Sequence, residues 1–418
     1  MNRTGSPSLR IALFTDTWTP QVNGVSRTLE RLVDHLRRSG HEVVVVSPRP
    51  RAKGKGGGVA HASENPRGGV PLEATSRPSL RASPPATLRA TCPPTAHLSV
   101  PGVPLFLYPE LLVTWTPGRS VRRKLEAFDP QVVHCATESV LGWWGRRWAL
   151  RSGRPLVTSF HTNFPDYAAG YGLGFVRPLA WSLLRRFHAP AARTLCPSEA
   201  TRADLRGRGF HDRVEVWSRG VDAEAFAPAY RSSQLREELA PGAETLLLYV
   251  GRLAPEKRLG LLLEAFVRLR ERETGGVALV LVGDGPMRKE LEARGEPDVH
   301  FAGYRTGAAL AAAYASADVF AFPSDTETFG NVVVEAMASG LPVVGVDRGG
   351  VGDIIRDGET GFLVPPGDAV AFAAALAALV RDPGMSRQMG SCARRDAESR
   401  SWSRILDGVI QQYREALS

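Results

Sequence analysis

The chain has 418 residues, of which 43% are hydrophobic, so it is long enough to bury the cores of two or three domains. This composition excludes a wholly disordered chain and a small fold that depends on disulfide bonds. The formal net charge of +9 divides unevenly, because residues 1–220 carry 31 basic and 15 acidic side chains, whereas residues 221–418 carry 21 and 28.

The first half alternates short apolar strands with amphipathic helices. A helix that starts near Val25 has an apolar face and is expected to end at Gly40. The segment 43–46 is apolar on both faces, which is typical of a parallel sheet covered by helices. The predicted strands cover 11–16, 41–48, 132–134, 155–162, 193–198 and 214–217, and further helices cover 117–128, 174–188 and a segment from Ser198.

The same alternation begins again after a polar linker. The predicted strands cover 245–250, 277–282, 299–304, 319–323 and 342–346, and the predicted helices cover 258–272, 286–294, 306–316 and 331–338. The apolar run 370–380 is too short to span a bilayer and indicates a buried helix. We therefore predict an α/β protein with two doubly wound, Rossmann-like parallel-sheet domains that face a cleft. Ligands of such sheets bind at the carboxyl ends of the strands, so we expect the site in this cleft.

Residues 51–100 interrupt the pattern. They contain seven prolines, six glycines and no aromatic residue, together with seven basic and two acidic side chains. Such a segment buries too little apolar surface to order itself, so we expect a disordered surface insertion.

The cysteines and the first residues bear on the compartment. Cys92, Cys135, Cys196 and Cys392 lie far apart, without the close spacing of a zinc site or a redox pair, which fits a reducing cytoplasm. Residues 1–10 are polar and lack the apolar stretch of a signal peptide.

Two cations follow the first strand of the second half. Gly251 would let the backbone approach a ligand, and Arg252 and Lys257 would place two positive charges at the end of that strand, which suits a diphosphate. A surface salt-bridge pair is the alternative interpretation. The turn that starts at Gly283 is mainly a strand-to-helix turn, because Arg288 occupies the third glycine position of a dinucleotide fingerprint.

The most informative segment joins the strand that ends at Pro323 to the helix that starts near Asn331. The free N–H groups of a helix start favour a phosphate. Glu327 lies in the turn before the helix and Glu335 lies one turn inside it, so one carboxylate could bind sugar hydroxyls and the other ribose hydroxyls. A solvated turn and helix face would look similar, but the helix is apolar, and a buried Glu335 needs a partner.

These motifs resemble the retaining glycosyltransferases of family 4, which have the GT-B fold. The resemblance covers nearly the whole chain outside 51–100, and it is nearest the lipid-directed α-mannosyltransferases and sulfoquinovosyltransferases. It rests on the segments FTDTWTPQVNGV (14–25), SFHTNF (159–164), CPSE (196–199), SRGVD (218–222), GRLAPEK (251–257), VGDGP (282–286) and TETFGNVVVEAMASGLPVV (326–344).

The resemblance implies roles for matched positions. Arg252 and Lys257 would hold the donor diphosphate, Glu327 would bind donor-sugar hydroxyls, and Glu335 would hold the ribose. The backbone of Phe329, Gly330 and Asn331 would contact the sugar or phosphate, Gly24 would allow close approach of the diphosphate, and Arg219 would assist at the phosphates. His161 would lie near the reacting sugar, or else it hydrogen-bonds its neighbouring loop.

The resemblance also implies three parts of the chain and a chemistry. Residues 1–220 would form an acceptor domain, 221–386 a nucleotide-sugar donor domain, and 387–418 helices that return to the first domain. Two fixed cations and a helix start can stabilise the leaving diphosphate, and no Asp-x-Asp signature is present, so we expect no metal and no cofactor.

The basic first half has a separate explanation. Arginines and a lysine crowd the predicted helix 117–128, and tryptophans at 143, 144, 148 and 181 lie beside further arginines. Aromatic residues beside cations suit a membrane interface, although the tryptophans could instead pack inside. We favour an anionic membrane surface over nucleic acid, for which no reader motif is present.

We therefore expect a cytoplasmic enzyme, peripheral on the inner face of the cell membrane. It would move a hexose from a UDP- or GDP-linked sugar to a lipid or lipid-linked acceptor. A GT-B enzyme with a soluble acceptor, such as a sucrose-type synthase or a nucleotide-sugar epimerase, is one alternative. A non-catalytic membrane-surface binding protein is the other. Neither the base nor the sugar of the donor follows from these residues.

Overall fold

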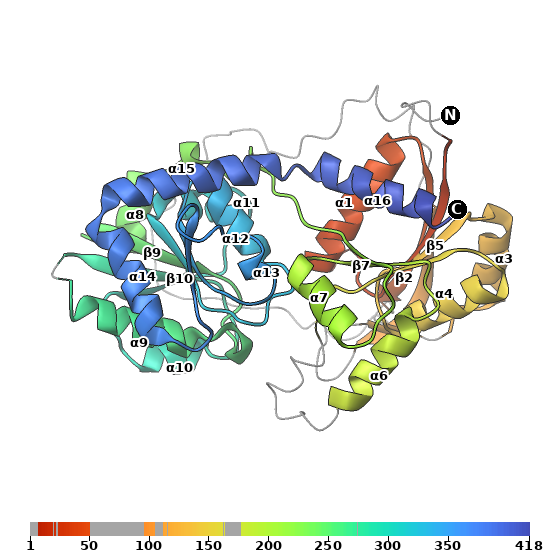
Figure 1. Ribbon diagram of the computed structural model, residues 1–418, viewed down its shortest axis with the longest axis horizontal. Coiled ribbons are helices and arrows are strands. Elements are labelled where there is room, and N and C mark those ends of the chain that lie inside the picture. The colour runs from red at the N-terminus through yellow and green to blue at the C-terminus, as the bar shows by residue number, and fades with distance from the viewer. Residues whose placement is uncertain are drawn as a thin grey trace, which may run out of the picture.

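The computed structural model describes residues 7–19, 21, 24–50, 96–104, 112–114, 116–161, 163, 177–273 and 275–418. Two α/β domains lie side by side in Figure 1, and α15 and α16 run along both. The prediction of two doubly wound parallel-sheet domains is confirmed.

The first domain is built on an eight-stranded sheet in the order β4-β3-β2-β1-β5-β6-β7-β8, in which β4 alone is antiparallel. Its strands are β1 (Arg10–Phe14), β2 (Glu42–Pro50), β3 (Ala96–Pro104), β4 (Leu112–Thr114), β5 (Val132–Cys135), β6 (Leu156–Ser159), β7 (Arg193–Cys196) and β8 (Val214–Val216). Its helices are α1 (Gly24–Arg38), α3 (Arg119–Phe128), α4 (Val140–Arg151), α6 (Arg177–His188) and α7 (Glu199–Gly207).

The second domain has a six-stranded parallel sheet in the order β11-β10-β9-β12-β13-β14. Its strands are β9 (Thr245–Val250), β10 (Val277–Val282), β11 (Val299–Gly303), β12 (Val319–Phe322), β13 (Val343–Val346) and β14 (Gly361–Val364). Its helices are α8 (Ser233–Leu239), α9 (Leu259–Arg270), α10 (Arg288–Ala293), α11 (Gly307–Ser316), α12 (Asn331–Ala338), α13 (Gly349–Gly352), α14 (Ala369–Arg381) and α15 (Pro383–Ser399), with short 3-10 turns η2 (Pro228–Tyr230) and η3 (Pro255–Lys257).

The expected insertion ends earlier than the sequence suggested. Residues 51–95 lie outside the described part of the chain, but Ala96 to Val100 form the start of β3 and pair in parallel with β2. Leu98 and Val100 are buried in the core on one face of the sheet. Buried residues at every second position are typical of a strand, but the average composition of the proline-rich segment concealed this pattern.

The C-terminal helices divide between the domains. The expectation that 387–418 returns to the first domain holds only for α16 (Trp402–Glu415), whose Leu406, Val409 and Ile410 pack on the core that includes α1. The helix α15 stays on the second domain, where Met389 and Ala393 are part of its core. The chain therefore crosses back between α15 and α16 (Figure 1).

Within the described residues, no single helix is long and apolar enough to cross a membrane. Taken together, α14 and α15 are long and apolar enough by length and composition alone. The two helices are bent by 103° at their junction.

Candidate functional site

The second sheet has its topological switch point between β9 and β12, because the neighbours of β9 are β10 on one side and β12 on the other. The segment from Gly251 to Lys257 follows β9, and the turn from Pro323 to Gly330 follows β12. Ligands of open α/β sheets bind at such a point. Folding thus brings the two predicted donor motifs together.

The Lys257 ammonium forms an ion pair with the Glu327 carboxylate, and each side chain is 16% exposed. Lys257 ends η3, directly after β9, and Glu327 lies between β12 and α12. The Ser324 hydroxyl donates to the same Glu327 oxygen at 3.3 Å. A cation and the carboxylate that is predicted to bind the donor sugar are therefore in direct contact.

Gly251 and Arg252 precede this pair. Arg252 is exposed, and its guanidinium makes no ion pair or hydrogen bond with any residue in the described part of the chain, so it is available to an anion. The packing of Tyr249 also requires glycine at position 251, which the sequence did not indicate. A Cβ there would lie 2.6 Å from the Tyr249 hydroxyl, which donates to the Arg252 carbonyl at 3.0 Å. The space beside Gly251 is filled by Tyr249 from within the domain.

The turn before α12 depends on glycine. Gly330 has φ = +110°, a conformation that favours glycine, and Phe329 beside it is buried, so its side chain belongs to the core. Sequence reasoning missed the support for this turn: the Gly350 N–H donates to the Glu327 carbonyl at 2.9 Å, and a Cβ on Gly350 would lie 2.3 Å from the Phe329 Cα. The paired glycines 349 and 350 after β13 were the available signal.

Glu335 lies on α12 and accepts a hydrogen bond from the Tyr314 hydroxyl at 3.1 Å, which is the partner that its apolar surroundings required. Burial raises the pKa of Glu335 to about 7, although the bond from Tyr314 and the charges of Arg27 and Arg31 act in the opposite direction. Both arginines belong to α1 of the first domain, so the predicted ribose carboxylate faces a basic helix across the domain boundary.

This pKa predicts how Glu335 affects stability. The folded protein holds the Glu335 proton more tightly than the unfolded chain, so the stabilising contribution is full below the ordinary pKa of 4.5 and is lost as the pH rises through about 7. Glu335→Gln mimics the protonated form. We expect it to raise the Tm relative to the wild type at pH 8 by much more than at pH 5. Thermal unfolding at both pH values checks this, with the exposed Glu264→Gln as a control; equal differences at the two pH values would contradict it.

His161 lies two residues beyond β6 and is buried, with its ring in edge contact with Trp217 at a centroid distance of 5.3 Å. Its Nδ1 lies 2.8 Å from a guanidinium nitrogen of Arg219, which can only donate, so Nδ1 accepts and Nε2 carries the proton. Nε2 has no hydrogen-bond partner in the described structure. Burial lowers the pKa of His161 well below its usual range, as does the charge of Arg219, so the ring is a neutral donor.

Arg219 is the residue that donates to the Nδ1 of His161. It is 5% exposed and also donates to the carbonyls of Trp217 and Ser218, at 2.5 and 3.2 Å. Burial lowers its pKa to about 10, which leaves it charged at neutral pH. The buried guanidinium therefore holds the His161 ring, and its role at the phosphates stays a prediction.

Contacts across the domain boundary join the two halves of the site. The Thr328 hydroxyl, next to Glu327, donates to the His161 carbonyl at 3.0 Å. A Cβ on Gly24, the first residue of α1, would lie 3.2 Å from the side-chain amide of Asn331, the first residue of α12. The starts of two helices thus lie close together at the boundary, where the positive ends of both helix dipoles favour an anion. The neighbouring motif residues 20, 22, 23 and 162 lie outside the described part of the chain.

The tryptophans of the basic half pack on the core, which is the alternative that the sequence left open. Trp148 and Trp181 are buried, Trp143 contacts Phe187 at a centroid distance of 5.2 Å, and Trp144 contacts Phe14 at 5.8 Å. Among the described residues of this half, the large apolar side chains that are exposed are leucines and a valine. They are Leu179 and Leu183 on α6, 63% and 49% exposed, and Val140 and Leu150 on α4.

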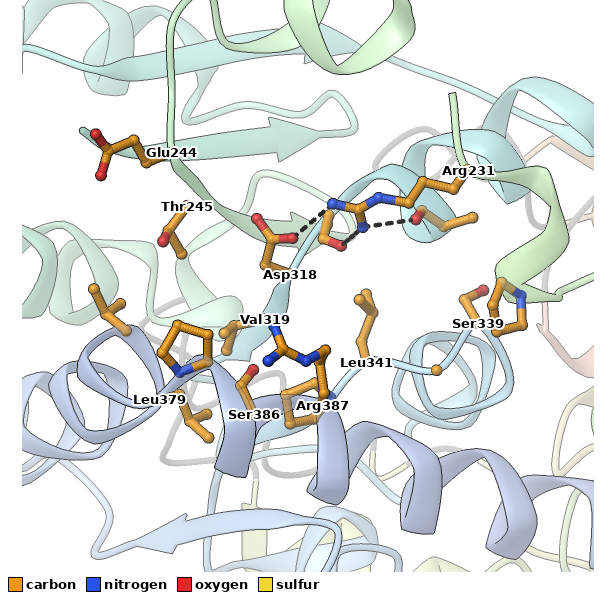
Figure 2. A pocket seen from close by; sticks show the side chains of 17 residues that line it. Arg231, Glu244, Thr245, Asp318, Val319, Ser339, Leu341, Leu379, Ser386 and Arg387 are labelled. Carbon is orange, nitrogen blue, oxygen red and sulfur yellow. Dashed lines mark hydrogen bonds and ion pairs between the residues drawn. The ribbon is translucent and has the colours of Figure 1, made fainter. Parts of the chain in front are cut away.

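A cavity of about 510 Å³ lies at the opposite edge of the second sheet from the candidate site, where β9, β12 and β13 begin. Figure 2 shows that Arg231 and Asp318 in this cavity pair with each other, at 2.9 Å, so these two charges are already satisfied. Arg387 also lines it. None of the predicted site residues lines this cavity.

The described residues include no group of three or more His, Cys, Asp or Glu side chains placed to hold a metal ion. Whether the reaction needs a metal is not tested by this observation, so metal independence stays a prediction.

Comparison with known proteins gives two family matches. Residues 22–225 match the family described as Glycosyltransferase Family 4, and residues 244–382 match Glycosyl transferases group 1. The chain is 37% identical over 410 residues to a GDP-mannose-dependent alpha-mannosyltransferase of Mycobacterium tuberculosis, covering 97% of this chain and 96% of the relative. It is 33% identical to the sulfoquinovosyl transferase SQD2 of Arabidopsis thaliana, covering 98% of this chain and 74% of the relative.

Solved structures agree on the fold. HepE of Anabaena, in complex with UDP-glucose, superposes with a TM-score of 0.66 at 21% identity and covers 96% of this chain and 98% of its own. Sucrose-phosphate synthase of Thermosynechococcus elongatus gives 0.69 at 22% identity, with 97% and 98% covered. The fold is therefore GT-B, as the resemblance implied.

Proposed function

Because the chain belongs to glycosyltransferase family 4, we propose that it transfers mannose from GDP-mannose to a lipid or lipid-linked acceptor at the inner face of the cell membrane. The transfer would retain the anomeric configuration and would need no metal ion. The observation that carries the proposal is the contact between Lys257 and Glu327 at the switch point of the second sheet. The choice of donor is supported by GDP-mannose-dependent relatives that are 35–37% identical over nearly the whole chain.

The donor would lie across the carboxyl end of the second sheet. Its diphosphate carries the charge that Lys257 and Arg252 can bind, and the free N–H groups at the start of α12 face the same region. When the Lys257 ammonium binds the diphosphate instead of Glu327, the Glu327 carboxylate can accept hydrogen bonds from sugar hydroxyls. Glu335, one turn into α12, would accept from the ribose hydroxyls.

The proposed step exchanges one bond to the anomeric carbon for another. The bond from this carbon to the diphosphate oxygen breaks, and its electron pair leaves with the diphosphate. An acceptor hydroxyl forms the new bond on the same face, and its proton passes to the departing phosphate oxygen. Lys257 and Arg252 stabilise the negative charge that develops there, and the Nε2–H of His161 donates to a hydroxyl of the sugar.

The acceptor side rests on the surface of the first domain. On α6, the exposed Leu179 and Leu183 lie four residues apart, on one face of the helix, and Arg185 and Arg186 on the same helix are also exposed. Leucines beside exposed arginines suit the headgroup region of an anionic membrane. We therefore propose α6 as the membrane-facing helix.

We expect Leu183→Glu to weaken binding to anionic vesicles about tenfold, because the change removes an inserting side chain and adds a repelled charge. Flotation with vesicles of phosphatidylglycerol and phosphatidylcholine measures this. The exposed Val370→Glu on the second domain is the matched control. Equal flotation of the two variants, or binding that does not fall with added salt, would count against the membrane face and favour a soluble acceptor.

The transfer itself is tested by incubating the protein with GDP-mannose, other GDP- and UDP-sugars and a membrane lipid extract. We expect a mannosylated lipid product, formed in the presence of EDTA, with the α configuration of the donor. A product formed only on a soluble sugar would favour the soluble-acceptor alternative. Donor binding without any transfer would favour a non-catalytic protein.

A further inference from the structure

The chain crosses between the domains twice, and the two crossings are bound to each other. The first crossing includes Gly220 and Val221, and the second includes Arg400 and Trp402. The Val221 N–H donates to the Arg400 carbonyl at 3.2 Å. A Cβ on Gly220 would lie 2.8 Å from the Arg400 carbonyl oxygen and from the Trp402 nitrogen, so only glycine allows this approach. The two crossings therefore form one double-stranded hinge.

Arg31 on α1 contacts one strand of this hinge and lies within reach of a charge on the other. Its guanidinium lies over the Trp402 ring, 4.8 Å from the ring centroid, which is a cation–π contact with the second crossing. The charge of Asp222, in the first crossing, also acts on Arg31. A single side chain of the first domain thus contacts the second crossing and interacts electrostatically with the first.

The same guanidinium is close enough to Glu335 for each charge to act on the other. Glu335 belongs to α12 of the second domain, and α1 and α12 also approach each other at Gly24 and Asn331. Arg31 is therefore placed between the hinge and the carboxylate proposed to hold the ribose, and part of its side chain stays exposed to a ligand.

We propose that Arg31 is a positioning residue that couples the hinge to the donor site. The contact of Arg31 with Trp402 fixes α1 to the hinge, and α1 approaches α12 at Gly24 and Asn331; Arg31 thereby stabilises the arrangement in which α1 and α12 together accept a nucleoside diphosphate. The inference rests on the proposed function only in taking the ligand at Glu335 to be the nucleotide of the donor. It assigns to Arg31 no contact with the reacting atoms.

The test uses GDP binding to the full chain, without acceptor, by titration calorimetry. We expect Arg31→Ala to weaken GDP binding about tenfold, within the range of coupling between linked sites. Arg38→Ala is the matched control, because Arg38 lies in the last turn of α1 and its Nε donates to the Asp34 carbonyl; we expect less than a twofold change. Small-angle scattering should show GDP-induced compaction of the wild type and less compaction of Arg31→Ala.

A double-mutant cycle separates coupling from a merely structural role. Trp402 is not among the residues proposed to contact the donor, so Trp402→Leu should weaken GDP binding several-fold only while Arg31 is present. Additive effects of Arg31→Ala and Trp402→Leu would overturn the inference. A lower Tm with unchanged GDP affinity in Arg31→Ala would also overturn it. If the wild type bound neither GDP nor UDP, the proposed function would fail first and the inference with it.

Discussion

Lys257→Ala is expected to lower kcat/KM for sugar transfer about 1,000-fold, since it removes a fixed positive charge from the oxygen on which negative charge develops. The reason is positional as well as electrostatic. Lys257 is held at the switch point by its contact with Glu327 in a setting where both side chains are 16% exposed, so its ammonium needs little rearrangement to meet a diphosphate. The measurement is the initial rate of product formation from GDP-mannose over a range of donor concentrations.

The same substitution leaves Glu327 without its cation, which costs stability. For a pair that is mostly but not fully buried we expect a loss of about 1–2 kcal/mol, below the cost of breaking a fully buried pair. The double variant Lys257→Ala with Glu327→Gln should recover the Tm and remain inactive. Arg268→Ala, an exposed cation on α9 paired with Glu264, serves as the control and should keep full activity. Recovery of activity together with stability would contradict a role for Lys257 in the reaction.

The architecture followed from the sequence because its main signals are local. Strands apolar on both faces alternate with helices of period 3.6, and each pattern is set within about ten residues. The donor motifs were found for a similar reason, since Lys257 and Glu327 each lie directly after a recognisable strand. The start of β3 was missed because its two buried residues stand at the end of a long proline-rich segment, where the average composition conceals them.

The roles of Arg219 and the tryptophans depended on packing, which sequence patterns do not contain. An arginine in an SRG motif gives the same pattern whether it points at a phosphate or behind a histidine; here it donates to His161 and to two backbone carbonyls. Tryptophans beside arginines are equally compatible with a membrane and with a core. Trp148 and Trp181 pack inward, and the exposed apolar residues are leucines whose positions raised no signal.

His161→Ala is expected to lower kcat about 100-fold and to leave the affinity for GDP nearly unchanged, because we propose that the ring donates to the sugar and not to the nucleotide. The structural basis is its tautomer. Arg219 donates to Nδ1, and the N–H at Nε2 is buried without a partner in the described residues. Such a donor can form a hydrogen bond with a substrate hydroxyl. Initial rates and GDP titration on the same variant separate the two effects.

Glutamine and asparagine at position 161 test which ring nitrogen is needed. The amide nitrogen of glutamine can reach the position of Nε2, whereas that of asparagine reaches the position of Nδ1. His161→Gln should therefore retain more activity than His161→Asn. Since the pKa of His161 lies well below its usual range, the ring stays neutral between pH 6 and 8, and its ionisation should not appear in the kcat profile there. His300→Ala, a histidine on β11, controls for loss of a ring elsewhere and should behave as the wild type. Equal activity of the glutamine and asparagine variants would contradict donation from Nε2. A fall in kcat near pH 6.5 that His161→Gln abolishes would show that His161 acts as a base and not as a neutral donor.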